Sequence, residues 1–338
     1  MSLLTAKQLF KTRDNARRPF KTQDSALAFY VNQLENLDKR LYLPLTSTSW
    51  GRDIDLRPGI SMSNESTSFI ASTFAAGGSL SQGDGVNGGN MPWVSPEATE
   101  IPGISIDGVK TVLPLRALAR EVSYTSIELE RSQALNQPID AQKMDAFNLS
   151  YQMNIDQMVY IGSTDVGATG LLNNAAVTAG SVAAGIAGPT TWSTKTPDEI
   201  LADINTLLAS TWLASAYAVC PAELRIPPTQ YALITTLKVS SAGNVSVLKY
   251  IQDNCIALNI NGKPLNIQPL KWLAGRGAAG ADRMIAYTKD VTRVRFPMVP
   301  VRRETAYYKG IRYTMPYVWA FGVMEFVYPE TVQYADGI

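Results

Sequence analysis

Hydrophobic and polar positions follow a helical period most clearly between Pro138 and Asn173. Apolar side chains recur there in steps of three and four residues, which places them on one face of an α-helix. They are Met144, Phe147, Tyr151, Ile155, Met158 and Val159. Pro138 suits the first helical turn, and Gly162 suits the left-handed position at which a helix ends. The pattern predicts a helix about 36 Å long whose apolar stripe supports a core.

A strand pattern surrounds a glycine-rich segment in residues 46–110. Residues 66–74 are typical of a strand, residues 75–90 are dense in glycine, and residues 101–112 are typical of a returning strand. We interpret them as a long β-hairpin that projects from the body, because the segment holds too little apolar material for a core of its own. A loop of this length is either disordered or functional, and an arm that pairs with a neighbouring molecule is functional.

Two further segments flank these elements. Residues 1–45 form a basic arm, in which apolar spacing predicts a short helix over 24–40. A loosely ordered terminus is the alternative. After the hairpin, a strand is expected from Thr111 with a bend at Pro114. The run over 126–135 predicts a short helix that leads into the long one.

Helices and strands alternate through residues 196–289, which indicates one compact α/β unit. Thr196 is a suitable N-cap and Pro197 a suitable first residue for a helix. We expect a strand at Tyr217–Cys220. Further helices are expected within 222–237 and over 247–254, and further strands over 265–272 and 284–289. The tail, 290–338, is mostly strand-like, with runs separated by proline and glycine.

Composition adds a hint about the surface. The chain has 338 residues, of which 46% are hydrophobic and 17% charged, with a formal net charge of +1. This length predicts two or three structural units. The low charge fits a surface covered by other subunits, and it fits an ordinary globular protein equally well. No secretion signal and no run of 18 apolar residues is recognisable in the sequence, so we expect a soluble product of the cytoplasm.

Missing residue types exclude several chemistries. The chain has no histidine, which removes the usual general base and the usual metal ligand. Its two cysteines, Cys220 and Cys255, lie far apart without a C-x-x-C motif, so we expect free buried thiols. We therefore expect no catalytic residue, no metal and no cofactor.

Charge is segregated along the chain. Ten Lys and Arg residues between Lys271 and Tyr313 face only three acids. Between Pro58 and Val109 there are five acids and no base. The basic arm and tail either neutralise nucleic-acid phosphates without reading sequence or pair with the acidic hairpin of neighbouring copies. We favour subunit contacts, because few aromatic residues are interleaved to stack on bases.

Two short motifs suggest a rival function. G-x-G-x-x-G occurs at residues 83–88 and 275–280, but a dinucleotide site needs a strand before it and a helix after it. Neither context fits, so turns are the better interpretation. Asp53 and Asp55 alternate on an expected strand, and such carboxylate pairs are usually solvated. An enzyme that binds a nucleotide or sugar in the α/β unit is the alternative from another class.

The order of elements and two stretches carry a family resemblance. IDQMVYIGSTDVGATGLLNN (155–174) looks like a helix exit followed by a glycine-bounded turn and G-L-L-N. The tail contains RFPMVPVRRE (295–304) and GIRYTMPYVWAFGVMEFVYPETVQYADGI (310–338). These features resemble the major capsid proteins of tailed bacteriophages, the Hong Kong 97 type. Phe321-Gly322-Val323 departs from the double glycine of one subgroup.

The resemblance implies an α+β fold of the Hong Kong 97-like capsid type and a division of the chain. The segments are an N-terminal arm (1–45), an extended β-hairpin loop (46–110), a peripheral domain with the spine helix (111–173), an α/β axial domain (174–289) and C-terminal strands that return to the peripheral domain (290–338). Lys110, at the hairpin base, is the only lysine available for a covalent cross-link of the kind some members form, so we expect none.

The resemblance also implies function and partners. It implies a major capsid protein that self-assembles, as hexamers and pentamers, into an icosahedral shell around double-stranded DNA. The DNA would be met by non-specific charge contacts. Separate scaffolding and portal proteins, possible decoration proteins, no membrane, synthesis in the host cytoplasm and a final place in the virion follow. An encapsulin-like shell of a cellular nanocompartment is the close alternative.

The candidate site residues are therefore interface residues. We expect aromatic and acidic contacts on the hairpin and basic contacts on the arm and tail. On the hairpin they are Phe69, Phe74, Trp93, Glu97 and Glu100, and on the arm and tail Arg17, Arg18, Arg302 and Arg303.

Overall fold

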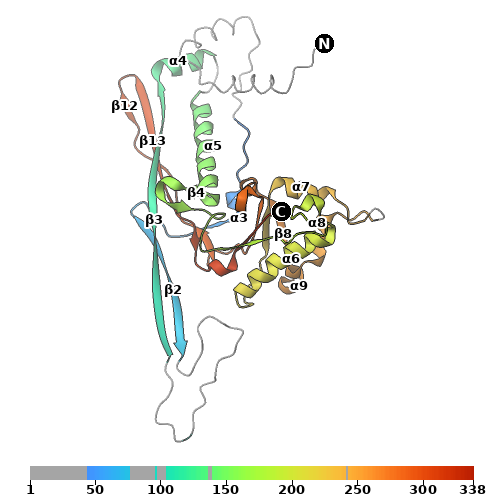
Figure 1. Cartoon of the computed structure of the whole chain (residues 1–338). Helices are drawn as coiled ribbons and strands as arrows, with labels where there is room; N and C mark the ends of the chain where they lie inside the picture. Colours follow the sequence, from blue (N-terminus) through green and yellow to red (C-terminus); the bar gives the residue numbers. More distant parts are fainter. Residues whose placement is uncertain (1–43, 77–95, 97–103, 136–138, 241–242) are drawn as a thin grey trace, which may run out of the picture.

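The computed structural model of the chain describes residues 44–76, 96, 104–135, 139–240 and 243–338. A long ribbon of strands runs along one side, a single long helix lies beside its upper half, and a unit of helices and short strands lies on the other side (Figure 1). None of the helices in these ranges is long and apolar enough to cross a membrane.

The first sheet is organised around one very long strand, β3 (Ile104–Thr125). Its first half pairs with β2 (Ser66–Ala76) and its second half with β13 (Arg312–Gly322), and both pairings are antiparallel. β13 also pairs with β11 (Met298–Arg303) and with β12 (Tyr307–Lys309). The change of partner falls at Pro114 and Leu115. The returning strand of the hairpin and the strand expected from Thr111 are thus one continuous element.

The long helix is confirmed as α5 (Ile139–Tyr160). It follows α4 (Ser126–Leu135), which is also as expected. Phe147, Tyr151 and Ile155 are buried on its inner face. The ring centroid of Phe147 lies 4.6 Å from that of Tyr317 on β13, so the predicted stripe packs on the first sheet.

Gly162 ends α5 as the sequence predicts. Its φ is +79°, and a Cβ atom there would lie 2.1 Å from the carbonyl oxygen of Ala168. Only glycine fits this position, because the backbone is left-handed and the two chain segments touch. The elements that follow are short. They are β4 (Gly162–Ser163), η1 (Thr164–Val166), β5 (Ala168–Thr169), β6 (Thr178–Ser181) and η2 (Trp192–Thr194).

The second sheet has the order β6-β15-β9-β7-β8. Its strands are joined by helices and turns in the compact unit. The remaining strands are β7 (Glu223–Ile226), β8 (Asn266–Pro269), β9 (Arg283–Tyr287) and β15 (Gln333–Asp336). The helices and turns are α6 (Pro197–Ala214), α7 (Pro228–Thr236), α8 (Val247–Asn254), α9 (Ile256–Asn261), η3 (Lys271–Leu273), η4 (Ala278–Gly280) and η5 (Pro329–Thr331).

α6 begins as the sequence predicts. Thr196 accepts a hydrogen bond from the backbone of Glu199, whose side chain accepts one in return, and Pro197 is the first helical residue. The strand expected at Tyr217–Cys220 is wrong. Ala216 and Tyr217 have φ of 51° and 62°, so the chain turns after α6. The indole Nε1 of Trp212 donates to the carbonyl oxygen of Tyr217 and holds that turn.

Two hydrophobic cores lie on opposite faces of the second sheet. Ile285 and Tyr287 of β9 belong to the core that contains the buried face of α5. Met284 and Ala286, which alternate with them, belong to the core under α6 and α8. The sheet therefore joins the compact unit to the long helix.

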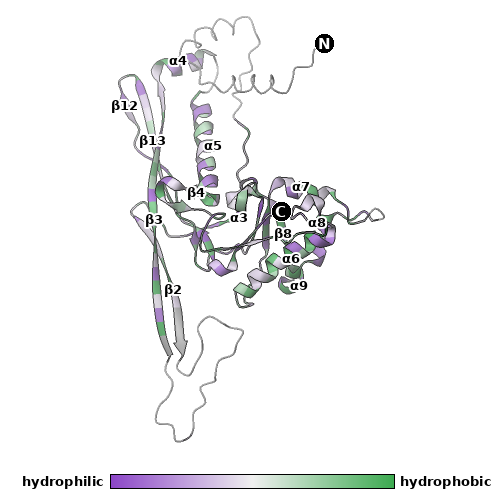
Figure 2. Ribbon diagram, in the orientation of Figure 1, coloured by the Kyte–Doolittle hydropathy of each residue, from purple (hydrophilic) through white to green (hydrophobic). Residues whose placement is uncertain are grey.

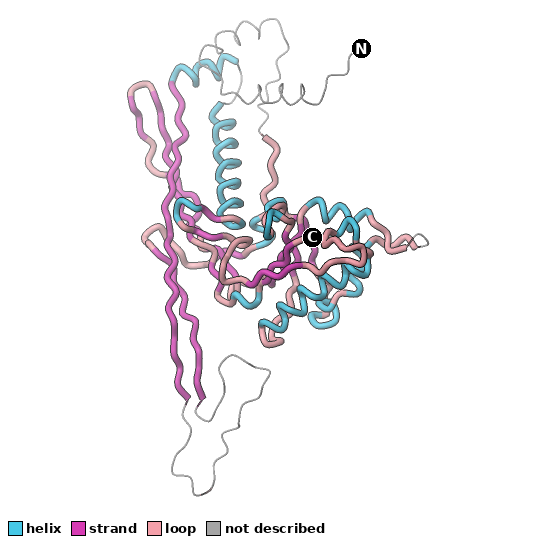
Figure 3. The backbone as a smooth tube through the Cα atoms, in the orientation of Figure 1, coloured by secondary structure: helices cyan, strands magenta, loops and turns pink. Residues whose placement is uncertain are grey.

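The tail divides between the two sheets. A third, small sheet consists of β1 (Asp55–Leu56), β10 (Val294–Phe296) and β14 (Glu325–Phe326). β11 to β13 belong to the first sheet, whereas β15 pairs with β9 and β6 of the second. In Figure 3 the strands of the first sheet stand apart as a long ribbon from the compact unit.

Candidate subunit-interface surfaces

The β2–β3 ribbon exposes apolar side chains on one face. Ile70 lies opposite Lys110 and Ser68 opposite Val112, and facing residues of a pair share a face. Ile106, four residues before Lys110 on the same strand, lies on this face too. Ile70, Ile106 and Val112 are 66%, 76% and 54% exposed. We name these three residues and Lys110 the ribbon face. Hydrophobic residues are visible along this free part of β3 in Figure 2.

The opposite face of the ribbon is partly covered by the chain itself. Thr67 is buried and Phe69 is partly buried there, while Val109 is 65% exposed. The root of the ribbon is held by Arg57, whose guanidinium donates to the Ser68 carbonyl oxygen and pairs with buried Glu325 at 2.5 Å. The ribbon thus leaves the body in a fixed direction.

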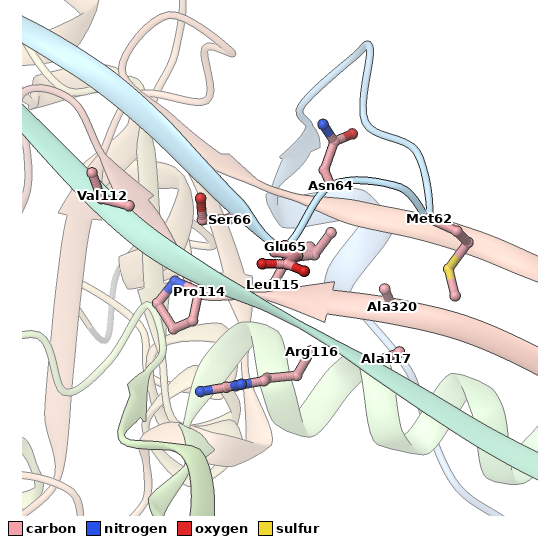
Figure 4. A pocket seen from close by; sticks show the side chains of 10 residues that line it. All are labelled: Met62, Asn64, Glu65, Ser66, Val112, Pro114, Leu115, Arg116, Ala117 and Ala320. Carbon is pink, nitrogen blue, oxygen red and sulfur yellow. The ribbon is translucent and has the colours of Figure 1, made fainter.

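A hollow of about 680 Å³ lies at the ribbon root, beside the point where β3 changes partner. Met62 and Asn64 on the preceding loop line it together with Val112, Ala117 and Ala320 of the first sheet (Figure 4). Glu65 and Arg116 are the charged residues of its lining. The hollow continues the ribbon face, because Val112 belongs to both.

A second apolar surface lies at the other end of β3. Tyr308 on β12 and Ile311 in the β12–β13 turn are 76% and 62% exposed. The Tyr308 and Tyr313 ring centroids lie 4.8 Å apart, and a hollow of about 390 Å³ is lined by both tyrosines, Ile311 and the start of α4. Lys309 and Arg312 face each other across the same turn. We name Tyr308, Lys309, Ile311 and Arg312 the tip surface.

The structure reduces the number of basic residues in the tail that are free to contact other molecules. Six of the ten Lys and Arg residues between Lys271 and Tyr313 form ion pairs inside the chain: Lys271, Arg283, Lys289, Arg293, Arg295 and Arg302. The other four, Arg276, Arg303, Lys309 and Arg312, form none with any carboxylate in the described ranges. Two of these four bases, Lys309 and Arg312, belong to the tip surface.

A buried polar network joins the two cores where the N-terminal segment enters the fold. The Asp53 carboxylate, at the end of α3 (Trp50–Asp53), accepts hydrogen bonds from Arg52 at 2.7 and 2.9 Å, from Arg225 on β7 at 2.8 Å and from Tyr160 on α5 at 2.5 Å. Burial alone would raise the pKa of Asp53, but the hydrogen bond from Arg52, the charge of Arg225 and the hydrogen bond from Tyr160 outweigh it and lower that pKa. Burial raises the pKa of the Tyr160 hydroxyl.

A second buried carboxylate holds the start of the same segment. Asp156 on α5 accepts from the backbone N–H of Ser49 at 2.8 Å and of Trp50 at 3.2 Å. It also accepts from the indole of Trp272 at 2.7 Å and pairs with Lys271 at 3.2 Å. Asp53 and Asp156 together hold residues 49–53 against the body.

The predicted interface residues are only partly placed. Five of them lie outside the described residues: Arg17, Arg18, Trp93, Glu97 and Glu100. Phe69 and Phe74 are in β2, with Phe74 opposite Ile106 in the register. Arg302 and Arg303 are exposed on β11, and Arg302 pairs with Glu304. The sequence analysis missed Ile70, Ile106, Tyr308 and Ile311, of which alternation along the two hairpin strands identifies Ile70 and Ile106.

The rival enzyme site finds no support in this geometry. The motif at 83–88 lies outside the described residues, and the one at 275–280 forms a turn that leads into β9 rather than a helix. Asp53 is buried in ion pairs and Asp55 pairs with Lys289. No group of three or more metal-binding side chains occurs in the part of the chain that the structure describes.

Comparison with known proteins identifies the class. A family model described as major capsid protein matches residues 89–338. This match covers most of the chain, so the chain belongs to the major capsid protein family. The comparison with curated proteins finds no match.

Solved structures identify the fold. The capsid of Myoviridae phage XM1 matches with a TM-score of 0.70 and 16% identity, over 91% of this chain and 98% of that one. A structure from Mycobacterium phage Adephagia matches with a TM-score of 0.55 and 11% identity, over 94% and 98%. The capsid structure of cyanophage P-SCSP1u matches with a TM-score of 0.54 and 13% identity, over 89% and 92%.

These matches confirm the Hong Kong 97-like fold expected from the sequence. The protein is a shell-forming capsid protein of phage virions that associates with itself, and its family and fold are those of structural proteins rather than enzymes. The family match favours a capsid protein over the nanocompartment shell.

Proposed function

We propose that the chain assembles as hexamers and pentamers into an icosahedral shell around the double-stranded DNA of a tailed phage. The observation that carries this proposal is the pair of exposed apolar surfaces, the ribbon face and the tip surface, on a chain of the capsid family. Two different surfaces on one subunit suit the heterologous contacts from which closed rings and shells are built.

The architecture supports the division of the chain into segments with different structural roles in the shell. Residues 1–45 would be the arm, 46–110 the extended loop, 111–173 the peripheral domain and 174–289 the axial domain at the five- and six-fold centres. Residues 290–338 would return to the peripheral domain, with the exception of β15, which pairs with β9 of the second sheet. The nine interface residues named from the sequence remain proposals, and exposed Arg303 fits best among those described.

Further partners follow from the same proposal. The enclosed DNA would be met through non-specific charge contacts, which depend on salt. Scaffolding and portal proteins, and possibly decoration proteins, would be separate chains. Synthesis would take place in the host cytoplasm.

Electron cryo-microscopy of the purified, concentrated protein tests the proposal. We expect closed particles with icosahedral symmetry, built from six- and five-membered rings. Open tubes, sheets or isolated rings under every assembly condition would contradict it.

A further inference from the structure

The second half of β3 has one edge that pairs with β13 and one edge that faces the other way. Gly322 of β13 donates its backbone N–H to the Pro297 carbonyl oxygen, away from β3. Its partner in the register is Leu115, whose backbone therefore points away from β13. The N–H of Leu115 donates to the Glu65 carbonyl oxygen at 3.0 Å on that side. β2 and β13 thus lie on opposite edges of β3.

Beyond Leu115 the edge on the β2 side is open. Backbone directions alternate along a strand, and the register between β3 and β13 runs without a bulge. Ala117, Ala119 and Glu121 therefore direct their N–H and C=O groups to the open side. These groups have no hydrogen-bond partner in the described part of the chain, and residues 116–121 are all exposed. An open edge of this kind is a template for another strand.

The hollow at the ribbon root lies where this open edge begins. Met62, Asn64 and Ala117 are among the residues that line it. In Figure 4 Ala117 lies on β3 beyond Glu65, at the point where the chain before β2 turns away from the strand. A strand added to the open edge would therefore continue the line of β2, and one of its side chains could enter the hollow.

The side chains beside the open edge indicate the chemistry of a partner. Arg116 and Arg120 lie on one face of β3 with Leu118 between them. The two arginines form no ion pair with a carboxylate of the described residues, and Arg120 donates to the Ser150 hydroxyl. Opposite charges across neighbouring strands are favourable. The pattern that fits is an extended segment with two acidic residues four positions apart and an apolar residue midway.

The chain itself does not offer such a segment. Acidic residues four positions apart with an apolar residue midway occur once in its sequence, at Glu199 and Asp203. Both lie in the helix α6, and Asp203 is buried in an ion pair with Lys195. The pattern therefore assigns the occupant of the edge to a different protein rather than to a second copy.

We propose that the open edge of β3 binds an extended acidic segment of a separate protein chain, which adds to the first sheet as a further strand beside residues 116–121. Backbone hydrogen bonds to Ala117, Ala119 and Glu121 would supply affinity, and acids opposite Arg116 and Arg120 would supply specificity. The inference goes beyond the shell function and is independent of it, because the edge is open on a single subunit.

A short synthetic peptide tests the binding. The probe is fluorescein-labelled Thr-Glu-Val-Phe-Val-Glu-Thr, and the control peptide carries Lys in place of both Glu residues. Fluorescence anisotropy with the unassembled subunit should show saturable binding of the probe, and the control peptide should bind at least about tenfold more weakly. No saturable binding of the probe below about 1 mM, or equal binding of the two peptides, would overturn the proposal.

Two arginine variants test the site. Arg116→Glu combined with Arg120→Glu should weaken binding of the acidic probe at least about tenfold and should strengthen binding of the Lys peptide. Arg131→Glu combined with Arg276→Glu is the matched control, because both arginines are exposed and the change in net charge is the same. It should bind the probe as the wild type does. Equal losses in the two variants would show that net charge alone attracts the peptide, which contradicts a defined edge.

Ala119→Pro tests the backbone contacts. A proline is tolerated in a strand where the N–H faces solvent, so the melting curve of the subunit should stay close to that of the wild type. The variant lacks one donor of the open edge and should bind the probe about tenfold more weakly. A folded Ala119→Pro subunit with wild-type affinity would overturn strand addition. The arginine variants decide the question if this variant does not fold.

Hydrogen exchange separates the possible occupants. In particles of the wild-type protein alone, the three outward amides of Ala117, Ala119 and Glu121 should exchange as fast as in the unassembled subunit and become protected when the probe is added. Protection in particles without the probe would assign the edge to a neighbouring copy and overturn the separate partner. A protein that forms no particle contradicts the shell function, whereas the peptide measurements on the subunit still decide the present proposal.

Discussion

The Nε atom of Arg225 donates a 2.8 Å hydrogen bond to Oδ1 of Asp53, a residue 172 positions earlier in the chain. Both side chains are fully buried. Arg225 belongs to the second sheet and Asp53 to α3, and Tyr160 on α5 donates a hydrogen bond to the same carboxylate. This contact holds the two cores together as one body. The β2–β3 ribbon and the tip surface extend from that body.

Asp53→Ala should destabilise the subunit strongly. It leaves the buried Arg225 guanidinium with only Glu223 as a carboxylate partner, at 2.6 Å, and breaking a buried ion pair in this way typically costs about 3–5 kcal/mol. Asp55→Ala is the matched control, because its pair with Lys289 is partly exposed and such pairs contribute up to about 1 kcal/mol. Urea denaturation of the unassembled subunit measures both, and equal losses would contradict the role of Asp53.

The contribution of Asp53 should depend on pH in a defined direction. Its pKa in the fold is below the ordinary value of 3.8, so the ionised group stabilises the fold above that value. The stabilisation is lost as pH falls through the lowered pKa. We expect the difference in unfolding free energy between wild type and Asp53→Asn to be constant from pH 7 to 5 and to shrink below about pH 4. A difference that grows on acidification would refute the assignment.

Gly162→Ala should be much more harmful than Gly167→Ala. Both residues have positive φ, but a Cβ at Gly167 meets nothing within 4 Å, whereas at Gly162 it lies 2.1 Å from the Ala168 carbonyl oxygen. Gly167→Ala should cost about 1–2 kcal/mol for the left-handed backbone. Gly162→Ala adds a clash between backbone segments, so we expect little soluble protein. Similar melting temperatures for the two variants would show that the turn yields easily.

Phe147→Ala tests the packing of the long helix on the first sheet. Phe147 is 4% exposed and lies against Tyr317, so its truncation should cost about 3–5 kcal/mol. Met153→Ala, on the exposed side of α5, should change stability by no more than about 0.5 kcal/mol. Chemical denaturation distinguishes the two, and comparable effects would argue against this helix as the support of the core.

Glu97→Lys combined with Glu100→Lys should impair shell assembly while the subunit stays folded. The reason is the one-signed hairpin, whose five acids between Pro58 and Val109 suit basic neighbours. The double Gln variant at the same positions should have a smaller effect, because it removes charge without reversing it. Normal particles of the double Lys variant in electron micrographs would contradict the hypothesis that the charge of the hairpin guides assembly.

Local sequence patterns were sufficient to predict many of the helices and strands. The stripe that contains Phe147, with Pro138 before it and Gly162 after it, predicted α5, and Thr196-Pro197 predicted the start of α6. The error at Tyr217–Cys220 has a local cause as well. An apolar run suggested a strand, but positive φ at Ala216 and Tyr217 turns the chain there.

Tertiary partners were beyond the reach of local patterns. Asp53 and Arg225 meet across 172 positions, and no spacing rule links them. The charge pattern assigns the basic tail to contacts outside the chain, whereas Glu325 and Asp336 pair with Arg295 and Arg283 inside the fold. The exposed pair Ile70 and Ile106 was predictable from alternation, but the strand order was needed to place both on one face.

The mass of the purified full-length protein in solution tests the central claim most directly. Size-exclusion chromatography with light scattering should give a closed particle in the megadalton range, built from subunits of 36.8 kDa. A stable monomer or dimer that persists across protein concentration and salt would contradict the account.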